Sequence, residues 1–403
     1  MSRRVVIVGG GQAGASAAAK LRALGHDGPI TMLSAEPVPP YQRPPLSKKY
    51  LLGSVTRERL YLKPESFYAD NDIELALGEP AEAIDRHAQE VVTQRRRLPY
   101  DALLLATGSV PRRLPAEIGG DLPGVLTMRD LADADAMAPL VVEGGHAIVI
   151  GGGYIGLEAA AVAASRGMAV TLIEAAPRIL GRVAAAETAD ALRALHQAHG
   201  VEILEGSGLA RLEPGGERRL RAVLTDDRVI DVDFALVGIG VTPGTALAEA
   251  AGLALENGIR TDETARSSDP AIWAAGDCAA FPWQDGRIRL ESVQNAIDQA
   301  EHAAAAMLGE TAPYKPSPWF WSDQFDTKLQ IAGLNLGHDR VICRPGSREG
   351  ALSIWYASTD RLIAVDAINE PRAYMQGKRW LEAGITPDLE ALADPARELK
   401  SLV

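Results

Sequence analysis

Two glycine-rich segments of the same form, G-x-G-x-x-G, constrain the fold of this chain more than any other feature. They cover residues 9–14 and 151–156, and each lies between an apolar run and a helical pattern. A loop of this form joins a strand to a helix and lets backbone amides and the helix N-terminus approach a pyrophosphate. An acidic residue follows each loop by about 20 positions, as the dinucleotide-binding pattern requires. The sequence therefore predicts one chain that binds two dinucleotides.

The composition is that of a globular protein with room for two or three domains. The chain has 403 residues, of which 47% are hydrophobic and 23% are charged, and its formal net charge is -12. This acidic balance argues against nucleic-acid binding. No apolar run approaches the ~20 residues of a membrane span, and no signal peptide precedes the first loop. We expect a cytoplasmic protein without nucleic-acid or membrane partners, and the sequence makes no prediction of its oligomeric state.

The cysteines and histidines predict neither a redox dithiol nor a metal site. Cys278 and Cys343 do not form a C-x-x-C or C-x-x-x-x-C pair. We therefore exclude a disulfide reductase and expect two reduced thiols. His196 and His199 are three residues apart in a helical pattern, but no third ligand lies near them in the sequence, so we expect no metal.

Each glycine loop belongs to a predicted βαβ unit, in which a crossover helix joins two parallel strands. The first unit is expected at 4–9, 12–25 and 30–34, and the second at 147–151, 154–166 and 169–174. Two further buried-strand runs cover 101–107 and 234–240. Beyond residue 319, alternating segments at 352–356 and 362–365 predict an antiparallel sheet, and the pattern is helical from about residue 387.

These patterns predict an α/β fold with two Rossmann-like dinucleotide-binding domains, the second inserted into the first, and a C-terminal α+β domain. The expected boundaries are 1–110 and 241–318 for the first domain, 111–240 for the inserted domain and 319–403 for the C-terminal domain.

The first loop and the acid that follows it give candidate residues for the first dinucleotide. Gly9 is expected to make the tight turn, Gly11 to admit the pyrophosphate, and Gly14 to let helix and strand pack closely. Ala13 lies within the same loop. Glu36, just past the second strand, is either the ribose-binding acid or a solvated loop carboxylate.

The second loop is followed by a better-placed acid. Glu174 ends the second strand of its unit. A carboxylate there accepts hydrogen bonds from an unmodified 2'-hydroxyl and repels a 2'-phosphate, so it predicts NADH rather than NADPH. Arg182, which lies nearby, could instead accommodate that phosphate. The other candidate contacts to this nucleotide are Gly151, Gly153, Ile155, Gly156 and Gly240.

Six segments in this order give the chain a family resemblance. They are R-P-P-L-S-K at 43–48, A-T-G at 106–108, G-G-G-Y-I-G-L-E at 151–158, A-G-D-C at 275–278, E-S-V-Q-N-A at 291–296 and W-F-W-S-D-Q at 319–324. Together they resemble the FAD-dependent, NADH-linked ferredoxin reductases of bacterial oxygenase systems. The resemblance covers essentially the whole chain. Its narrowest signals are the segments at 43–48 and 321–324.

The resemblance implies roles for residues that the glycine loops alone do not identify. It places Lys48 beside the reacting edge of the flavin and Glu158 at the flavin–nicotinamide junction, where the two can pair and take part in catalysis. A cation near the flavin stabilises negative charge that develops there. It assigns five further residues to FAD, namely Ala81, Arg129, Asp277, Val293 and Trp321.

For several of these residues a purely structural role remains an alternative. Glu158 could be a first-turn helix carboxylate favoured by the dipole, Asp277 a turn residue, and Trp321 a core aromatic. The family commonly carries an acid at the position of Ala35, whereas here the carboxylate comes one residue later. Either Glu36 reaches the ribose from a shifted position or Ser34 takes part.

The expected function follows from the resemblance. NADH would reduce FAD, and the flavin would pass electrons singly to a 2Fe–2S ferredoxin that serves a haem monooxygenase or a Rieske dioxygenase. One alternative is a reductase of rubredoxin or another small acceptor, and a second is a flavin redox sensor like the apoptosis-inducing factors. Residues 43–63 hold six basic residues against one acid. They form either part of a ferredoxin-docking face or a solvated segment.

Overall fold

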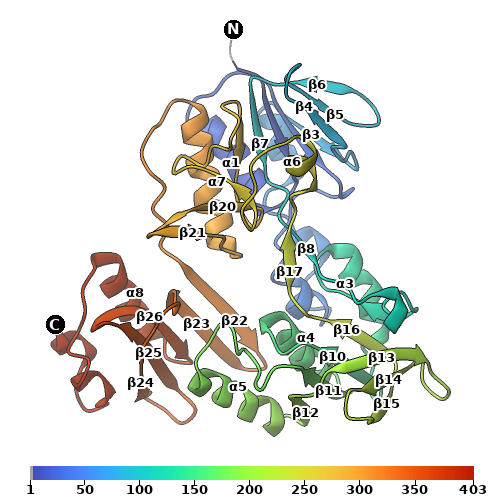
Figure 1. Ribbon diagram of the computed structural model, residues 1–403, viewed down its shortest axis with the longest axis vertical. Coiled ribbons are helices and arrows are strands. Elements are labelled where there is room, and N and C mark those ends of the chain that lie inside the picture. The colour runs from blue at the N-terminus through green and yellow to red at the C-terminus, as the bar shows by residue number, and fades with distance from the viewer. Residues whose placement is uncertain (1–2) are drawn as a thin grey trace. The chain divides into compact units, whose positions relative to one another are not determined.

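The computed structural model describes residues 3–403 and folds into two compact units (Figure 1). The first unit contains residues 3–42, 57–110 and 241–316, and the second contains residues 43–56, 111–240 and 317–403. The boundaries of the three predicted domains stay a prediction, and each unit is described below by itself.

The core of the first unit is a five-stranded parallel sheet in the order β19-β7-β1-β2-β3. The strands are β1 (Val5–Val8), β2 (Ile30–Ser34), β3 (Ile73–Leu77), β7 (Ala102–Leu105) and β19 (Ile272–Ala274). Every residue of β1, β2 and β7 is buried. This explains why β1 and β7 appear in the sequence as continuous apolar runs, as strands covered on both faces do.

Two alanine-rich helices pack against each other beside this sheet. They are α1 (Gln12–Ala23) and α7 (Val293–Met307). Small side chains let the two helices approach closely, and the alanines at their contact are fully buried. The helices α2 (Glu65–Asp70) and α6 (Ala246–Ala250) complete the helical part of the unit.

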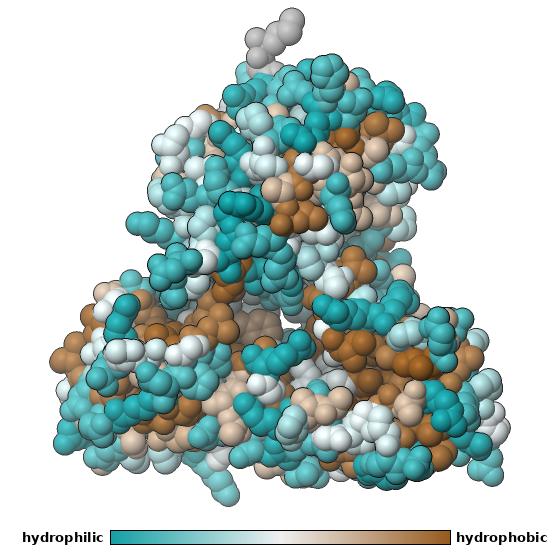
Figure 2. Space-filling model, viewed as in Figure 1, coloured by the Kyte–Doolittle hydropathy of each residue, from teal (hydrophilic) through white to brown (hydrophobic). Residues whose placement is uncertain are grey.

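Three small sheets accompany the parallel sheet of the first unit, and one strand residue in them, Pro111, belongs to the second unit. The first contains β4 (Ala83–Asp85), β5 (Glu90–Val92) and β6 (Arg97–Pro99). The second contains β18 (Ile259–Arg260), β20 (Ala279–Trp283) and β21 (Gly286–Ile288), and the third pairs β8 (Ser109–Pro111) with β17 (Val241–Pro243). On the face drawn in Figure 2, polar residues predominate over this unit and apolar residues form small groups between them.

The second unit repeats the parallel sheet. Its order is β12-β11-β10-β16-β9, with β9 (Val125–Leu126), β10 (His146–Ile150), β11 (Ala169–Glu174), β12 (Val201–Glu205) and β16 (Phe234–Val237). The helices are α3 (Leu131–Met137), α4 (Tyr154–Ser165) and α5 (Ala186–Ala198). A three-stranded antiparallel sheet of β13 (Leu209–Pro214), β14 (Leu220–Leu224) and β15 (Val229–Val232) accompanies them. In both units the glycine loop follows the central strand, which confirms the two predicted Rossmann-like arrangements.

An antiparallel sheet forms the C-terminal part of the second unit. Its order is β22-β23-β26-β25-β24, with β22 (Trp319–Gln324), β23 (Thr327–Gly333), β24 (Arg340–Pro345), β25 (Leu352–Ser358) and β26 (Arg361–Ile368). One helix, α8 (Pro371–Ala383), packs on β23 and β26. The predicted α+β character of this region is confirmed.

The helix expected from about residue 387 is wrong. The helix of this region comes earlier, since Pro371 stands at its first turn and Gly384 closes it in the left-handed conformation, with φ +66°. Beyond it the chain forms only short 3-10 turns at Ala391–Ala393 and Leu399–Leu402. Pro387 and Pro395 each remove an amide donor from that segment, so a continuous helix cannot form there.

Among residues 3–403, no helix combines the length and the apolar character needed to span a bilayer.

Candidate functional site

The first glycine loop has the geometry that its spacing predicts. Gly9 has φ +127°, and a Cβ there would lie 2.1 Å from the carbonyl oxygen of Ala106. A Cβ on Gly14 would lie 2.0 Å from the carbonyl oxygen of Gly9. A Cβ on Gly11, in contrast, would meet no atom of the chain within 4 Å. The first and third glycines are therefore required by packing within the chain, and the second borders open space, as expected where a pyrophosphate approaches.

The second loop repeats this pattern position by position. Gly151 has φ +107°, and a Cβ there would lie 2.5 Å from the carbonyl oxygen of Gly238. A Cβ on Gly156 would lie 2.2 Å from the carbonyl oxygen of Gly151, whereas one on Gly153 would meet nothing within 4 Å. The two loops are thus equivalent in their packing and in the position that they leave open.

The helices that follow the loops begin without a side-chain cap. Gly11 and Gly153 are the N-cap residues of α1 and α4, and neither helix has an acidic residue in its first turn. By comparison, Asp130 caps α3 and Ser292 caps α7. The first amides of a helix need acceptors and carry the positive end of its dipole. The uncapped starts of α1 and α4 therefore fit a nucleotide pyrophosphate at each loop. Ala13 is buried within this first turn, and Ile155 exposes its side chain.

Glu174 is held beside the second loop. Its Oε2 accepts a hydrogen bond from the amide of Gly152 at 2.8 Å, and its Oε1 accepts one from the amide of Ala176 at 2.8 Å. The carboxylate therefore has a fixed position at the end of β11. Arg182 is exposed, and its Nη2 lies 3.8 Å from where a Cβ on Gly240 would stand. The structure thus brings two of the predicted nucleotide residues, Arg182 and Gly240, together in the second unit.

The corresponding place in the first unit is occupied differently. Ser34 is buried, and its hydroxyl donates to the carbonyl oxygen of Glu36 at 3.1 Å. The Glu36 carboxylate is half-buried and accepts a hydrogen bond from Tyr41 Oη at 2.6 Å. Ala35 is exposed. Ala81 lies between β3 and β4 and packs partly buried against a core cluster of this unit.

Two further predicted residues lie near the ends of elements in the first unit. Asp277 follows β19, and its Oδ2 accepts a hydrogen bond from Ser109 Oγ at 2.9 Å. Val293 is the first residue of α7. The Ser292 cap accepts the amide of Asn295 at 3.1 Å, so it does not satisfy the amides of Val293 and Gln294. Those amides fit an acceptor outside the helix.

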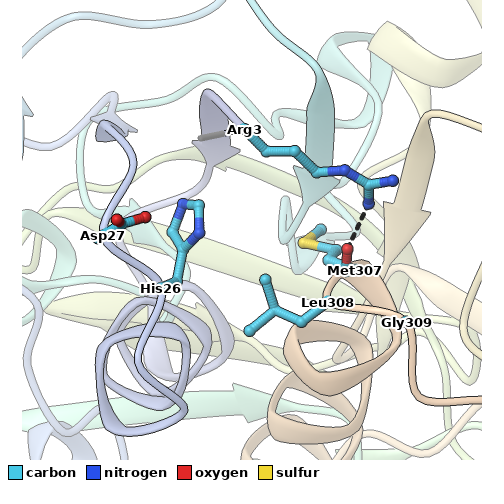
Figure 3. Close-up of a pocket in the computed structure, with 6 residues that line it drawn as sticks. All are labelled: Arg3, His26, Asp27, Met307, Leu308 and Gly309. Atoms are coloured by element: carbon cyan, nitrogen blue, oxygen red, sulfur yellow. Dashed lines mark hydrogen bonds between the residues drawn. The ribbon is translucent and has the colours of Figure 1, made fainter. Parts of the chain in front are cut away.

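A cavity of the first unit is lined by none of these residues. It has a volume of about 310 Å³ and is lined by Arg3, His26, Asp27, Met307, Leu308 and Gly309 (Figure 3). The guanidinium of Arg3 donates to the carbonyl oxygen of Met307, at the C-terminal end of α7. A cation is stabilised at a helix C-terminus. Since the glycine loop begins α1 at its opposite end, this cavity is not the nucleotide site.

Lys48 and Glu158 form a buried ion pair in the second unit. Lys48 belongs to the short helical turn Leu46–Tyr50, which packs against α4. Its Nζ lies 2.9 Å from Glu158 Oε1, and the two side chains are 14% and 6% exposed. Asp323 Oδ2 lies 4.0 Å from the same Nζ. The structure therefore joins the two residues that the resemblance assigned to catalysis.

Two serine hydroxyls complete the surroundings of Glu158. Ser322 Oγ donates to Oε1 at 2.7 Å, and Ser47 Oγ donates to Oε2 at 3.1 Å. Burial raises the pKa of Glu158, while the Lys48 ammonium and these hydroxyls act in the opposite direction. An ionised carboxylate at this depth needs such partners, and a buried charge without them is strongly unfavourable.

The remaining predicted flavin residues are half-buried in the second unit. Trp321 lies on β22 with its ring 5.6 Å from that of Trp319 and 6.4 Å from that of Phe320. The amide of Arg129 donates to Asp133 Oδ2 at 2.8 Å, and its carbonyl oxygen accepts from Arg43 Nη1 at 2.9 Å. Neither Trp321 nor Arg129 is fully enclosed by the chain.

The sequence interpretation did not identify Ser47, Ser322, Gln324 or His196 as parts of this site. Ser322 and Gln324 share the buried face of β22, since side chains two residues apart in a strand point to the same side. Polar residues at buried strand positions were the signal that could have found them. His196 was considered as a metal ligand, and it instead contacts Gln324. Among residues 3–403 no group of three potential metal ligands occurs.

The match to known families accounts for both glycine loops. A family model described as pyridine nucleotide-disulphide oxidoreductase matches residues 3–300. The chain belongs to this family. A second model, described as reductase C-terminal, matches residues 319–403.

Full-length relatives narrow the comparison. Rhodocoxin reductase of Rhodococcus erythropolis is 40% identical over 97% of this chain and 92% of its own length. Putidaredoxin reductase of Pseudomonas putida is 40% identical over 99% of this chain and 96% of its own length. A crystal structure of the covalent putidaredoxin reductase–putidaredoxin complex matches with a TM-score of 0.95 and 38% identity, covering 99% of this chain and 98% of that one.

These comparisons confirm the predicted family resemblance. They also confirm an oxidoreductase that uses FAD and a pyridine nucleotide. The family's description mentions a disulphide, but this chain does not contain one, because Cys278 and Cys343 are both free.

Proposed function

We propose that this chain passes electrons from NADH through FAD to a 2Fe–2S ferredoxin that serves an oxygenase, either a haem monooxygenase or a Rieske dioxygenase. The observation that carries the proposal is the full-length match to putidaredoxin reductase, which includes both glycine loops and the C-terminal region. When bound, the flavin takes up an electron pair from the nicotinamide and releases the electrons one at a time.

The first unit would hold the FAD. The open position at Gly11 and the uncapped start of α1 support pyrophosphate binding there. For the ribose we favour Glu36 over Ser34, because the Ser34 hydroxyl is buried and already donates to the Glu36 carbonyl oxygen. Asp277 and the first amides of α7 would supply further hydrogen bonds to this cofactor.

The second unit would hold NADH. The fixed carboxylate of Glu174 supports a hydrogen-bonded ribose with a free 2'-hydroxyl, and it opposes a 2'-phosphate. Arg182 is exposed beside Gly240 and is the residue through which NADPH could still bind. We therefore propose a preference for NADH over NADPH. Glu174→Gln should lower the ratio of the rate of flavin reduction by NADH to the rate by NADPH, because it removes the negative charge and keeps the size of the side chain.

We propose that Lys48 and Glu158 act at the reacting edge of the flavin, with Arg129, Ala81 and Trp321 as further FAD contacts. These roles rest on the family resemblance. They are supported by an ammonium and a carboxylate held 2.9 Å apart and largely shielded from water, where their charges act strongly. The Lys48 side chain would stabilise negative charge on the bound group, and Glu158 would fix the position of that ammonium.

The decisive experiment separates cofactor reduction from partner reduction. Stopped-flow reduction of the flavin by NADH and by NADPH would be followed by electron transfer to ferredoxins from the source organism. Fast reduction by NADH and turnover with a 2Fe–2S ferredoxin are expected. Faster turnover with rubredoxin or another small acceptor would overturn the ferredoxin assignment. NADH-dependent dimerisation, persistent charge-transfer colour and poor turnover with every ferredoxin would instead indicate a redox sensor.

We also propose that the protein acts in the cytoplasm. Its two cysteines are both free, as is usual for proteins of a reducing compartment. Cell fractionation with an antibody to the native protein tests this, and recovery outside the cytoplasmic fraction would contradict it.

A further inference from the structure

A chain of buried hydrogen bonds leads from helix α5 to the carboxylate of Glu158. His196 Nε2 lies 2.8 Å from Gln324 Oε1, and Gln324 Nε2 donates to Ser322 Oγ at 3.0 Å. Ser322 Oγ in turn donates to Glu158 Oε1 at 2.7 Å. The four residues come from α5, β22 and α4, and all of them belong to the second unit.

The direction of these hydrogen bonds is set at the histidine. His196 Nδ1 is buried without a hydrogen-bond partner, whereas Nε2 faces the Gln324 amide. The proton therefore belongs on Nε2, because a buried donor needs an acceptor. Gln324 then accepts through its oxygen and donates through its nitrogen. Since Ser322 accepts from that nitrogen, its own hydroxyl proton is free to donate to Glu158.

The surroundings keep His196 neutral. Its side chain is fully buried, and its ring packs edge-on against Phe325 at a centroid distance of 5.1 Å. Burial lowers the pKa of His196. The charged groups at the Glu158 end of this hydrogen-bonded series are Lys48 and Asp323, and His199 is the titratable group that acts on His196 electrostatically. A neutral His196 imidazole keeps one N–H group at physiological pH, so its hydrogen bond to Gln324 does not change there.

We propose that His196 is a positioning residue for Glu158, acting through Gln324 and Ser322. Without the His196 donor, nothing fixes the Gln324 amide, and a rotation by half a turn presents its oxygen to Ser322. The Ser322 hydroxyl can then donate to Gln324, and Glu158 loses a hydrogen bond that stabilises its ionised form. The inference rests on the proposed role of the Lys48–Glu158 pair.

The first test is a set of variants read by a pH profile. His196→Phe removes the donor and keeps a flat ring, Ser322→Ala removes the last hydroxyl, and the double variant combines the two. His199→Gln is the matched control, because His199 directly follows α5, is exposed, and hydrogen-bonds the carbonyl oxygen of Leu195 rather than Gln324, Ser322 or Glu158. The measured quantity is the rate of flavin reduction by NADH in the holoenzyme. It is recorded from about pH 5 to about pH 9, so that the acid limb of the profile can be followed.

His196→Phe and Ser322→Ala should each move the acid limb of this profile to higher pH and slow the reaction about tenfold at its acid end, as expected for losing one charge-assisted hydrogen bond. The double variant should add little to either single variant, because both act through the same hydroxyl. His196→Gln restores an N–H donor and should return the profile toward that of the native enzyme. Additive effects, or a native profile in His196→Phe, would overturn the inference.

A second measurement does not depend on turnover. In ¹⁵N NMR spectra of the full-length holoenzyme at neutral pH, His196 should show the neutral Nε2–H tautomer, because Nε2 faces the Gln324 oxygen and Nδ1 has no partner. A charged or Nδ1–H imidazole would overturn the inference by itself. If Glu158→Gln leaves flavin reduction unchanged, the proposed role of Glu158 fails. Two results then still decide whether His196 acts through Ser322. They are the tautomer of His196 and whether the losses of thermal stability in His196→Phe and Ser322→Ala add up in the double variant.

Discussion

At the scale of single residues, Lys48 is the side chain whose charge matters most. Its ammonium offsets the buried Glu158 carboxylate at 2.9 Å. Lys48→Met keeps the length of the side chain and removes that charge, so it should raise the pKa of Glu158 and slow flavin reduction by about a hundredfold, the cost of losing one preorganised electrostatic group. Stopped-flow reduction by NADH measures the rate.

The neighbouring Lys49 provides the control for this experiment. It is exposed, so Lys49→Met should leave the rate of flavin reduction unchanged. An unchanged hydride-transfer rate in Lys48→Met would refute the role of Lys48, and a loss confined to thermal stability would show that the pair is structural.

A second residue-scale prediction concerns Asp366, a buried carboxyl group that accepts hydrogen bonds from two hydroxyl groups. Its Oδ2 accepts from Tyr356 Oη at 2.5 Å and from Thr188 Oγ1 at 2.7 Å. Burial raises the pKa of Asp366 to about 6, above the 3.8 of the unperturbed group. The folded state therefore binds this proton more tightly than the unfolded state. The contribution to stability is present in full below about pH 4 and is lost as the pH rises through about 6.

The comparison of native protein with Asp366→Asn isolates this effect from the other carboxyl groups. Between pH 4 and pH 7 the native protein should lose up to ~3 kcal/mol of unfolding free energy relative to the variant. Denaturant unfolding at several pH values gives the difference. A difference that does not change with pH would show that Asp366 titrates alike in the folded and unfolded states.

Residue identities could be predicted where a local pattern carries them and were missed where partners are distant in the sequence. Gly9, Gly14 and Glu174 follow from spacing within one βαβ unit. Ser322 and His196 do not, since each contacts a residue more than 100 positions away. Periodicity predicts that such a residue is buried, and only the folded chain supplies its partner.

At the scale of elements, each strand–loop–helix unit contains glycines of two kinds: those packed against the backbone and those that border open space. Gly14→Ala and Gly156→Ala would place a Cβ 2.0 Å and 2.2 Å from a backbone oxygen, so each should destabilise its unit by ~3 kcal/mol, as overpacked cores do. Gly11→Ala and Gly153→Ala meet no atom of the chain. They should leave the melting temperature of the apoprotein unchanged and weaken binding of the nucleotide.

The four variants control one another. Thermal melts of the apoprotein and titrations with FAD and with NADH should show that Gly11→Ala weakens FAD binding alone and Gly153→Ala weakens NADH binding alone. If Gly11→Ala and Gly153→Ala bind both nucleotides normally, the open space at these loops is not where the pyrophosphates lie.

The sequence patterns predicted the elements best where burial is uniform. The apolar runs that became β1, β7, β10 and β16 were recognised because both faces of these strands are covered. The helix expected from about residue 387 was wrong because a charged, periodic segment resembles a helix even where prolines interrupt it, and α8 was not predicted. Pro371 at the start of α8 and Gly384 at its end are the local signals that mark the true helix.

At the scale of the whole molecule, net charge poses a problem for the proposed partner. The chain carries -12, and a ferredoxin of the proposed type is typically acidic, so the two would repel unless a local basic surface meets the partner. The basic stretch 43–63 is divided between the two units, with Arg43–Thr56 in the second and residues from Arg57 onward in the first. Arg57 and Arg59 are exposed on the short turn Arg57–Leu60 of the first unit.

Charge reversal at this turn tests whether it meets the ferredoxin. Arg57→Glu and Arg59→Glu should each slow ferredoxin reduction about tenfold at low salt, because opposite charges across an interface mainly raise the rate of encounter. The difference from the native enzyme should shrink at high salt, where the screening length is short. Reduction of a small neutral dye by NADH should stay unchanged, since it needs no docking surface. Arg348→Glu, an exposed reversal in the second unit, is the matched control. Equal loss of both activities would indicate damage to the flavin site, and loss of neither would make residues 43–63 a solvated segment.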